Sequence, residues 1–190
     1  MAGGSTHELG RWGVVWAGGL VLLLGWHTAH KLGSGLLPEM LWACHLASAF
    51  AAVALLVGWS RGAAAAAVFH LANGLPAWLV EVLTVGTTWT SVGLHLGTSA
   101  LILPLWRSVP GWTPLFALGL WSLGVMLGRL VDPGLNVNIA WRPYPGLLPH
   151  DSPLWWSHVG NILLIGLCSG LVSVVLRRAA GPARGLRGLA

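Results

Sequence analysis

The sequence predicts an all-α, polytopic membrane protein with six transmembrane helices, and three observations carry this prediction. Hydrophobic residues make up 55% of the 190 residues and charged residues only 8%, whereas soluble domains carry about 25% charged residues. Six apolar segments are each long enough for a hydrocarbon core of about 30 Å. The net charge of +5 arises from thinly scattered residues. This composition excludes an ordinary soluble domain, a disordered chain and a nucleic-acid-binding domain with its dense basic face.

The six expected spans follow one another through mostly short connections. They cover residues 11–30, 40–59, 63–83, 87–106, 112–131 and 153–176. The first could be mistaken for a secretory signal, but His27-Thr28-Ala29-His30 is a poor cleavage site, so we expect a retained span. An N-terminal segment 1–10, an outer loop 132–152 and a basic tail 177–190 complete the chain. We therefore expect the activity to lie in or beside the bilayer.

Lys and Arg residues predict the orientation, because cytoplasmic loops are enriched in them. One side of the predicted topology holds seven: Arg11, Arg61, Arg107, Arg177, Arg178, Arg184 and Arg187. The other side holds Lys31, Arg129 and Arg142. We expect both termini in the cytoplasm and the protein in the inner (plasma) membrane as a multi-pass protein.

The first three spans place their polar residues toward the outer surface. Polar and ionisable side chains inside a membrane are costly and usually functional. The first span ends with His27 and His30, which we expect on one helix face, and the second begins with Cys44 and His45. The third rises through His70 and Asn73 to Glu81.

The last three spans repeat this bias. The fourth descends through several Thr residues to His95, the fifth rises to Arg129, and the sixth begins with His158 and Asn161. The inner half holds little beyond Ser169 and Ser173. We infer a polar cavity that opens toward the outer leaflet or outer face. Glu81 and Arg129 also fit a plainer interpretation as solvated span ends or as a pair with each other.

The outer loop is predicted to cover this cavity. Its Pro and Gly content prevents a helix through most of residues 132–152. Asn136 and Asn138 alternate with the apolar Val137 and Ile139. Amides turned inward and apolar groups turned toward lipid or protein are typical of a lid.

Cys44 and His95 are the predicted catalytic pair. A thiol attacks as its thiolate and needs a nearby base, for which His is usual. His45 is adjacent, but neighbouring helical residues do not face each other. His95 is expected within roughly 6 Å of the depth of Cys44 at 1.5 Å per residue. Cys168 is expected roughly 15 Å deeper than Cys44, so two free thiols are predicted rather than a disulfide.

Two other chemistries use the same residue types. Helical histidines bind haem in membrane cytochromes, and His45 with His95 or His158 are candidates for such a pair. A metal near the outer face is a second alternative, with a candidate set of His27, His30, His45 and His158. A non-catalytic lipid-binding subunit is a third. No tight metal signature is present, and the preferred mechanism requires neither metal nor cofactor.

The order of short motifs resembles a known family. Along the chain these motifs are Ala43-Cys44-His45-Leu46, Leu71-Ala72-Asn73-Gly74, Gly93-Leu94-His95, Asn136-Val137-Asn138-Ile139 and Trp156-Ser157-His158. Their order and spacing over roughly residues 40–165 resemble the YwaF-like bacterial integral membrane proteins. They also resemble an animal multi-pass ether-phospholipid acyltransferase family. The sequence departs from the animal relative by having Trp141-Arg142-Pro143 where that protein carries a Cys-Pro.

The resemblance implies acyl chemistry on a phospholipid. The acyl-accepting cysteine of the family falls on Cys44 and its essential histidine on His95. We therefore expect an acyltransferase or acyl hydrolase that passes through an acyl-thioester. Supporting roles are expected for His45, His70, Asn73, Glu81, Arg129, Asn136, Asn138 and His158. Among these, Asn73, His45 or His158 would stabilise an oxyanion, and Arg129, or Arg142 of the loop, would hold the phosphate.

Overall fold

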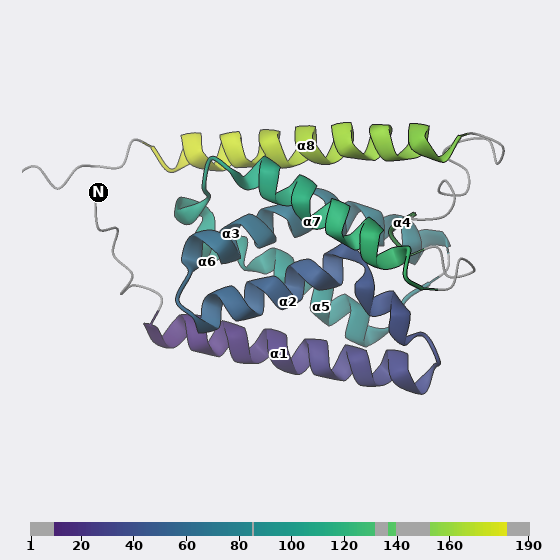
Figure 1. Cartoon of the computed structure of the whole chain (residues 1–190). Helices are drawn as coiled ribbons and strands as arrows, with labels where there is room; N and C mark the ends of the chain where they lie inside the picture. Colours follow the sequence, from purple (N-terminus) through teal and green to yellow (C-terminus); the bar gives the residue numbers. More distant parts are fainter. Residues whose placement is uncertain (1–9, 85, 132–136, 140–152, 182–190) are drawn as a thin grey trace, which may run out of the picture.

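The computed structural model describes residues 10–84, 86–131, 137–139 and 153–181, and this part of the chain is helical with no strand. Its main helices are α1 (Gly10–Gly33), α2 (Ala43–Leu56), α3 (Ser60–Phe69), α4 (Leu75–Thr84), α5 (Trp89–Ala100), α6 (Ile102–Leu105), α7 (Thr113–Gly128) and α8 (Leu154–Ala179) (Figure 1). Short helical segments join them: η1 (Leu37–Leu41), η2 (His70–Gly74), η3 (Trp106–Ser108) and η4 (Val137–Ile139). The predicted all-α class is confirmed.

Three helical rods are long and apolar enough to cross a membrane: Arg11–Gly33, Ser60–Leu83 and Leu154–Ala179. They coincide with the first, third and sixth expected spans. The apolar helices Ala43–Leu56 and Thr113–Gly128 lie within the second and fifth expected spans but are shorter than a full crossing. At 1.5 Å per residue they are roughly 21 and 24 Å long. The structure thus supports a membrane protein with three candidate spans.

Local sequence explains why the second and fourth segments are shorter than expected. Gly58 has a φ of +73° and ends α2, with Trp59 N–H bonded to Ala54 C=O at 2.7 Å. This is the pattern of a glycine-terminated helix, in which a left-handed residue closes the last turn. In the fourth segment Pro104 cannot donate to the carbonyl of Ala100, and α5 ends at Ala100. The expected continuous span 87–106 is therefore broken at Leu101.

The third rod is continuous but locally widened. Residues His70–Gly74 form a π-helix between α3 and α4, in which the Leu75 N–H bonds to the His70 carbonyl. Pro76 follows at once and has no N–H for the carbonyl of Ala72, so the regular ladder is interrupted here. A π-helical turn absorbs such an interruption without breaking the helix, and these turns are frequent at functional sites. The Asn73-Gly74 step widens the helix rather than ending it.

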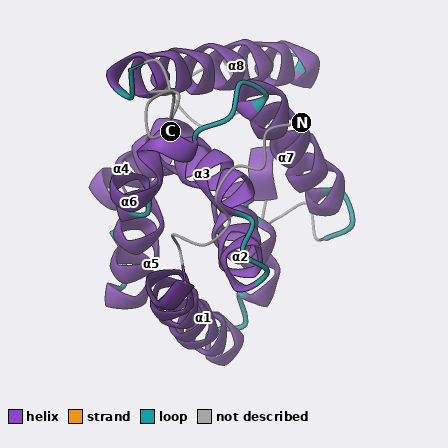
Figure 2. Ribbon diagram, turned by 90° about the vertical axis from the view of Figure 1, so that its left-hand side faces the viewer, coloured by secondary structure: helices purple, strands orange, loops and turns teal. Residues whose placement is uncertain are grey.

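The long helices alternate in direction through one bundle (Figure 1). The end of α1, the start of α2, the end of α4, the start of α5, the end of α7 and the start of α8 lie at the same end. Helix α1 packs against α2 and α5, α2 against α3, and α7 against α8. In a view along the bundle, α8 runs across one side of it and α1 lies on the opposite side (Figure 2).

The interior is built from small residues and the outer surface from large apolar ones. Ala63, Ala64, Ala65, Ala66 and Ala67 have no exposed surface. Small side chains allow the close helix contacts that membrane proteins use. Large apolar side chains are instead exposed along α1 and α8, among them Trp12, Val15, Leu22, Trp26, Trp155, Leu163 and Leu167. A surface of this kind suits contact with lipid rather than water.

Candidate functional site

Four buried histidines meet in the interior of the bundle. They come from α1, α2, η2 and α5, and each has at most 6% of its surface exposed: His27, His45, His70 and His95. The ring centroids of His27 and His45 are 4.9 Å apart, those of His45 and His95 5.7 Å, and those of His70 and His95 5.0 Å. Ring contact thus runs from His27 through His45 and His95 to His70. We call this set the histidine row.

Cys44 lies beside the middle of the histidine row. One ligand atom each from Cys44, His45 and His95 lies within 4.8 Å of the other two. Both histidines are buried, whereas Cys44 is partly exposed. The structure therefore brings together the two predicted catalytic residues and one predicted supporting residue. We call these three residues the Cys-His-His triangle.

Hydrogen bonds to backbone carbonyls fix the two imidazoles of the triangle. His95 Nδ1 lies 2.9 Å from the Ser91 carbonyl, and His45 Nδ1 lies 3.0 Å from the Glu39 carbonyl. A carbonyl oxygen can only accept, so Nδ1 carries the proton in both rings. Each Nε2 is then left with a free lone pair. Trp78 stacks on the His95 ring at 5.0 Å and further fixes its plane.

The two outer histidines of the row bond to hydroxyl groups instead. His27 Nδ1 lies 2.9 Å from Thr90 Oγ1, and His70 Nδ1 lies 3.2 Å from Ser99 Oγ. A hydroxyl both donates and accepts, so either tautomer of these two rings is allowed. Their Nε2 atoms are buried and have no hydrogen-bond partner within the described part of the chain. Buried polar atoms without partners are rare and call for an explanation.

Asn138 holds the first turn of α2, which carries Cys44. It is fully buried and has a φ of +54°, a conformation that Asn tolerates better than most residues. Its Oδ1 accepts from the Ala43 N–H at 2.7 Å. Its Nδ2 donates to the carbonyls of Leu41, at 2.7 Å, and Gly124, at 2.8 Å. Asn138 thus joins η4, the start of α2 and α7, and it serves as a positioning residue for the cysteine.

Two glycines allow the close approach that this arrangement needs. A Cβ placed on Gly74 would lie 3.2 Å from Cys44 Cβ and 3.4 Å from His70 Cγ. A Cβ placed on Gly124 would lie 3.0 Å from Asn138 Nδ2 and 3.3 Å from Ala43 Cβ. Both spacings are tight for carbon atoms, so the π-helical turn and α7 approach α2 at positions without side chains.

The other predicted residues lie outside the triangle. Asn73 is partly buried and donates to Ser169 Oγ on α8 at 2.8 Å, so it joins two helices. Glu81 and Arg129 are exposed near the ends of α4 and α7. His158 is partly buried on α8, and its ring nitrogens find no hydrogen-bond partner among the described residues. Asn136, Arg142 and most of the predicted lid lie outside the described residues.

Several expectations require correction. His27 is buried but His30 is exposed, so the two do not share one functional face. The expected metal set of His27, His30, His45 and His158 is not brought together. The described part of the chain groups Cys44, His45 and His95 instead. Cys44 and Cys168 are both free, as predicted.

Several residues near the triangle were not assigned to the site from the sequence. Ser91 and Ser99 flank His95 by four residues on either side, so they share its helix face. This spacing alone would have been enough to find them. Trp78 and Gly74 gave no such signal, because their contacts to His95 and Cys44 join different helices. Ser48 and Thr98 also link α2 to α5 through a 2.8 Å hydroxyl contact.

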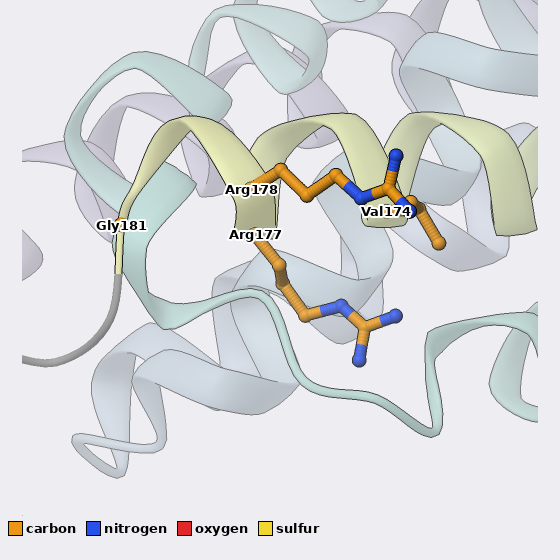
Figure 3. A pocket seen from close by; sticks show the side chains of 4 residues that line it. All are labelled: Val174, Arg177, Arg178 and Gly181. Carbon is orange, nitrogen blue, oxygen red and sulfur yellow. The ribbon is translucent and has the colours of Figure 1, made fainter.

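The polar side chains pack against one another, whereas a cavity lies at the other end of α8. This cavity has a volume of about 540 Å³ and is lined by Val174, Arg177, Arg178 and Gly181 (Figure 3). Arg177 Nε donates to the Ser173 carbonyl at 3.2 Å. Two guanidinium groups thus lie together at the end of a candidate span.

Comparisons of the chain with models of known protein families, with curated proteins and with solved structures find no match. The function is therefore inferred from the geometry of the site.

Proposed function

We propose that this protein is an integral membrane acyltransferase or acyl hydrolase acting on phospholipid acyl esters through Cys44 and His95. The observation that carries the proposal is the Cys-His-His triangle, in which ligand atoms of Cys44 and His95 lie within 4.8 Å. A nucleophile and its base need to be within or near hydrogen-bond reach, and this distance is often looser before substrate binds. The resemblance to lipid acyltransferases, which rests on the same two residues, agrees with this assignment.

The tautomer of His95 suits a general base. Because Nδ1 donates to the Ser91 carbonyl, the lone pair lies on Nε2. In hydrolytic triads the histidine is oriented in the same way, by an acceptor on Nδ1 that leaves Nε2 to take the proton of the nucleophile. Here the acceptor is a neutral carbonyl, and the stacked Trp78 ring adds a second restraint. His95 is thus held in one orientation before any substrate arrives.

The proposed reaction has two half-reactions. His95 Nε2 takes the proton of the Cys44 thiol, and Sγ attacks the carbonyl carbon of a phospholipid ester. The ester C–O bond breaks, the glycerol oxygen takes the proton back from His95, and a lysophospholipid leaves. The acyl group then remains on Cys44 as a thioester. In the second half, a lysolipid hydroxyl or water loses its proton to His95 and attacks the thioester carbonyl carbon. The C–S bond breaks, Cys44 Sγ takes the proton back from His95, and the new ester or the free fatty acid leaves.

His70 is the best-placed donor for the oxyanion. The His45 Nδ1–H is bonded to the Glu39 carbonyl, and Asn73 donates to Ser169, so two of the three predicted donors are already engaged. The third, His158, lies on α8 outside the triangle. In His70, a hydrogen bond from Ser99 Oγ–H to Nδ1 would place the ring proton on the unpartnered Nε2. Preorganised donors of this kind stabilise developing negative charge most effectively in a water-poor site. His70 also contacts both His95 and the Gly74 position beside Cys44.

The membrane arrangement is part of the proposal. Helices α2, α5 with α6, and α7 complete six crossings, and both termini lie in the cytoplasm. The alternating helix directions and the apolar outer surface support this topology (Figure 1). Arg129, exposed at the end of α7, would hold the phosphate of a lipid in the outer leaflet. A fluorescent protein fused to the C-terminus should fluoresce in cells, whereas an alkaline phosphatase fusion there should be inactive.

Intact mass spectrometry tests the chemistry. The purified protein is incubated with phosphatidylcholine carrying one defined acyl chain, and the mass increase and the released lysolipid are measured. We expect one acyl adduct, which neutral hydroxylamine removes because it cleaves thioesters. The adduct should be absent in Cys44→Ala and should form much more slowly in His95→Ala, while Cys168→Ala serves as the matched thiol control.

An adduct that persists in Cys44→Ala would overturn the proposal. So would unmodified protein without lysolipid release under every lipid condition, which would favour a lipid-binding subunit. A visible spectrum with a Soret band would instead favour the haem alternative.

A further inference from the structure

The Cys-His-His triangle has the donor set and orientation of a transition-metal site. Thiolate and imidazole are the ligands that zinc prefers in proteins. The structure groups one Cys and two His ligand atoms within 4.8 Å. A tetrahedral zinc ion with bonds of about 2.0–2.3 Å spaces its ligand atoms about 3.5 Å apart. Side-chain rotation on binding would draw the triangle inward to this spacing.

The hydrogen bonds around the triangle match those around metal-binding histidines. A metal-ligating His donates its other ring N–H to a carbonyl or carboxylate, which fixes the tautomer and the ring orientation. His45 and His95 both do so, through the carbonyls of Glu39 and Ser91. With Nδ1 protonated in both rings, the two Nε2 lone pairs have only one proton in the triangle to accept, that of the Cys44 thiol. A bound cation satisfies all three atoms at once.

The outer members of the histidine row supply a second, independent observation. His27 and His70 are fully buried, and the Nε2 of each is unpartnered within the described part of the chain. Their rings contact His45 at 4.9 Å and His95 at 5.0 Å, respectively. A metal with three protein ligands keeps its fourth position for water or another exogenous ligand. A hydrogen bond to such a ligand would explain an unpartnered Nε2 beside the triangle.

We propose that Cys44, His45 and His95 bind Zn²⁺, with the fourth position left to an exogenous ligand. Binding displaces the thiol proton of Cys44 and forms a Zn–S bond, so one proton is released to solvent per ion. Zinc then occupies the thiolate and the His95 lone pair that acyl transfer needs, and it inhibits acylation reversibly. The inhibition rests on the proposed function, whereas the metal binding does not.

Cobalt(II) is the spectroscopic probe for this site. The purified full-length protein in detergent micelles is stripped with a chelator and titrated with Co²⁺. We expect a sulfur-to-cobalt charge-transfer band that saturates at one ion per chain and disappears when Zn²⁺ displaces the cobalt. Cys44→Ala should abolish the band, and His45→Ala should weaken Co²⁺ binding about tenfold or more. Cys168→Ala and His30→Ala, which alter a thiol and an imidazole outside the triangle, should leave the band unchanged.

Acylation is measured on the same samples. Zn²⁺ should stop adduct formation over the concentration range in which it displaces Co²⁺, and a chelator should restore it. Adduct formation with no cobalt–thiolate band would overturn the metal proposal and leave acyl transfer standing. A band that survives in Cys44→Ala would also overturn the metal proposal. A band that depends on Cys44, in a protein that never forms an adduct, would support the metal site and count against acyl transfer.

Discussion

The same helical rod, residues 60–84, takes part in two very different interiors. Its first half carries Ala63–Ala67, which pack against α2 and α6 with no exposed surface. Its π-helical turn carries His70, whose ring contacts His95, and Gly74, whose position lies beside Cys44. The alanine half is held by close packing and has no polar demands. The π-helical half depends on hydrogen bonds and exact spacing between helices. A small displacement there should therefore lower the acylation rate before it lowers the free energy of unfolding.

The largest effect is expected at His95. His95→Gln removes the base but keeps a polar side chain of similar size, so the rate of acyl adduct formation should fall about 10²- to 10⁴-fold. Rapid-quench mass spectrometry of the adduct measures this rate. His30→Gln is the matched control, since His30 is exposed on α1 and should react at the rate of the unaltered protein. Equal rates for both variants would remove His95 from the mechanism.

The second largest effect is expected at Asn138, which holds the first turn of α2 beside Cys44. Asn138→Ala leaves the Ala43 N–H and the carbonyls of Leu41 and Gly124 without their partner. Each buried unsatisfied group costs about 1–3 kcal/mol, so thermal unfolding in detergent should begin at a clearly lower temperature. Asn161→Ala, which removes a single bond to Ser157 on the same helix, should cost less. If Asn161 proved the more costly of the two, the anchoring role of Asn138 would be wrong.

The alanine half of the rod should respond to volume rather than polarity. Ala65→Leu adds carbon atoms where no space is exposed, and overpacking of this kind costs about 1–3 kcal/mol of unfolding free energy. The acylation rate per folded molecule should stay close to that of the unaltered protein. Val15→Leu on the exposed face of α1 is the control and should leave the unfolding transition unchanged. A large loss of rate in folded Ala65→Leu would show that the two halves are coupled.

The smallest effect is expected at Gly74, where the π-helical turn lies beside Cys44. In Gly74→Ala the new methyl group lies 3.2 Å from Cys44 Cβ, so the turn must shift by a few tenths of an ångström. We expect about a tenfold slower acylation, in line with the sensitivity of catalysis to misplacement. Gly119→Ala on α7, where a Cβ meets nothing within 4 Å, should leave the rate unchanged. An unaltered rate in Gly74→Ala would show that the spacing between Gly74 and Cys44 does not affect acylation.

Periodicity and length predicted where helices occur better than they predicted where each helix ends. All six expected segments contain helix, because long apolar runs bounded by Gly, Pro and basic residues leave few other structures in a membrane. Their interruptions were harder to place. Pro104 breaks the fourth segment, whereas Pro76 is absorbed by a π-helical turn within the third rod. Both prolines lack the same hydrogen bond, and the surrounding packing decides which response follows.

By itself the sequence determined the helical class, the apolar surface and the bias of polar residues toward one end of the bundle, because these follow from composition and from depth along each helix. Depth also placed Cys44 and His95 at similar levels. The tertiary structure alone decided which side chains at that level meet, because rotation of each helix about its axis sets its inward face. That rotation brought His45 into the triangle, set Asn138 against the Cys44 turn and turned His30 outward.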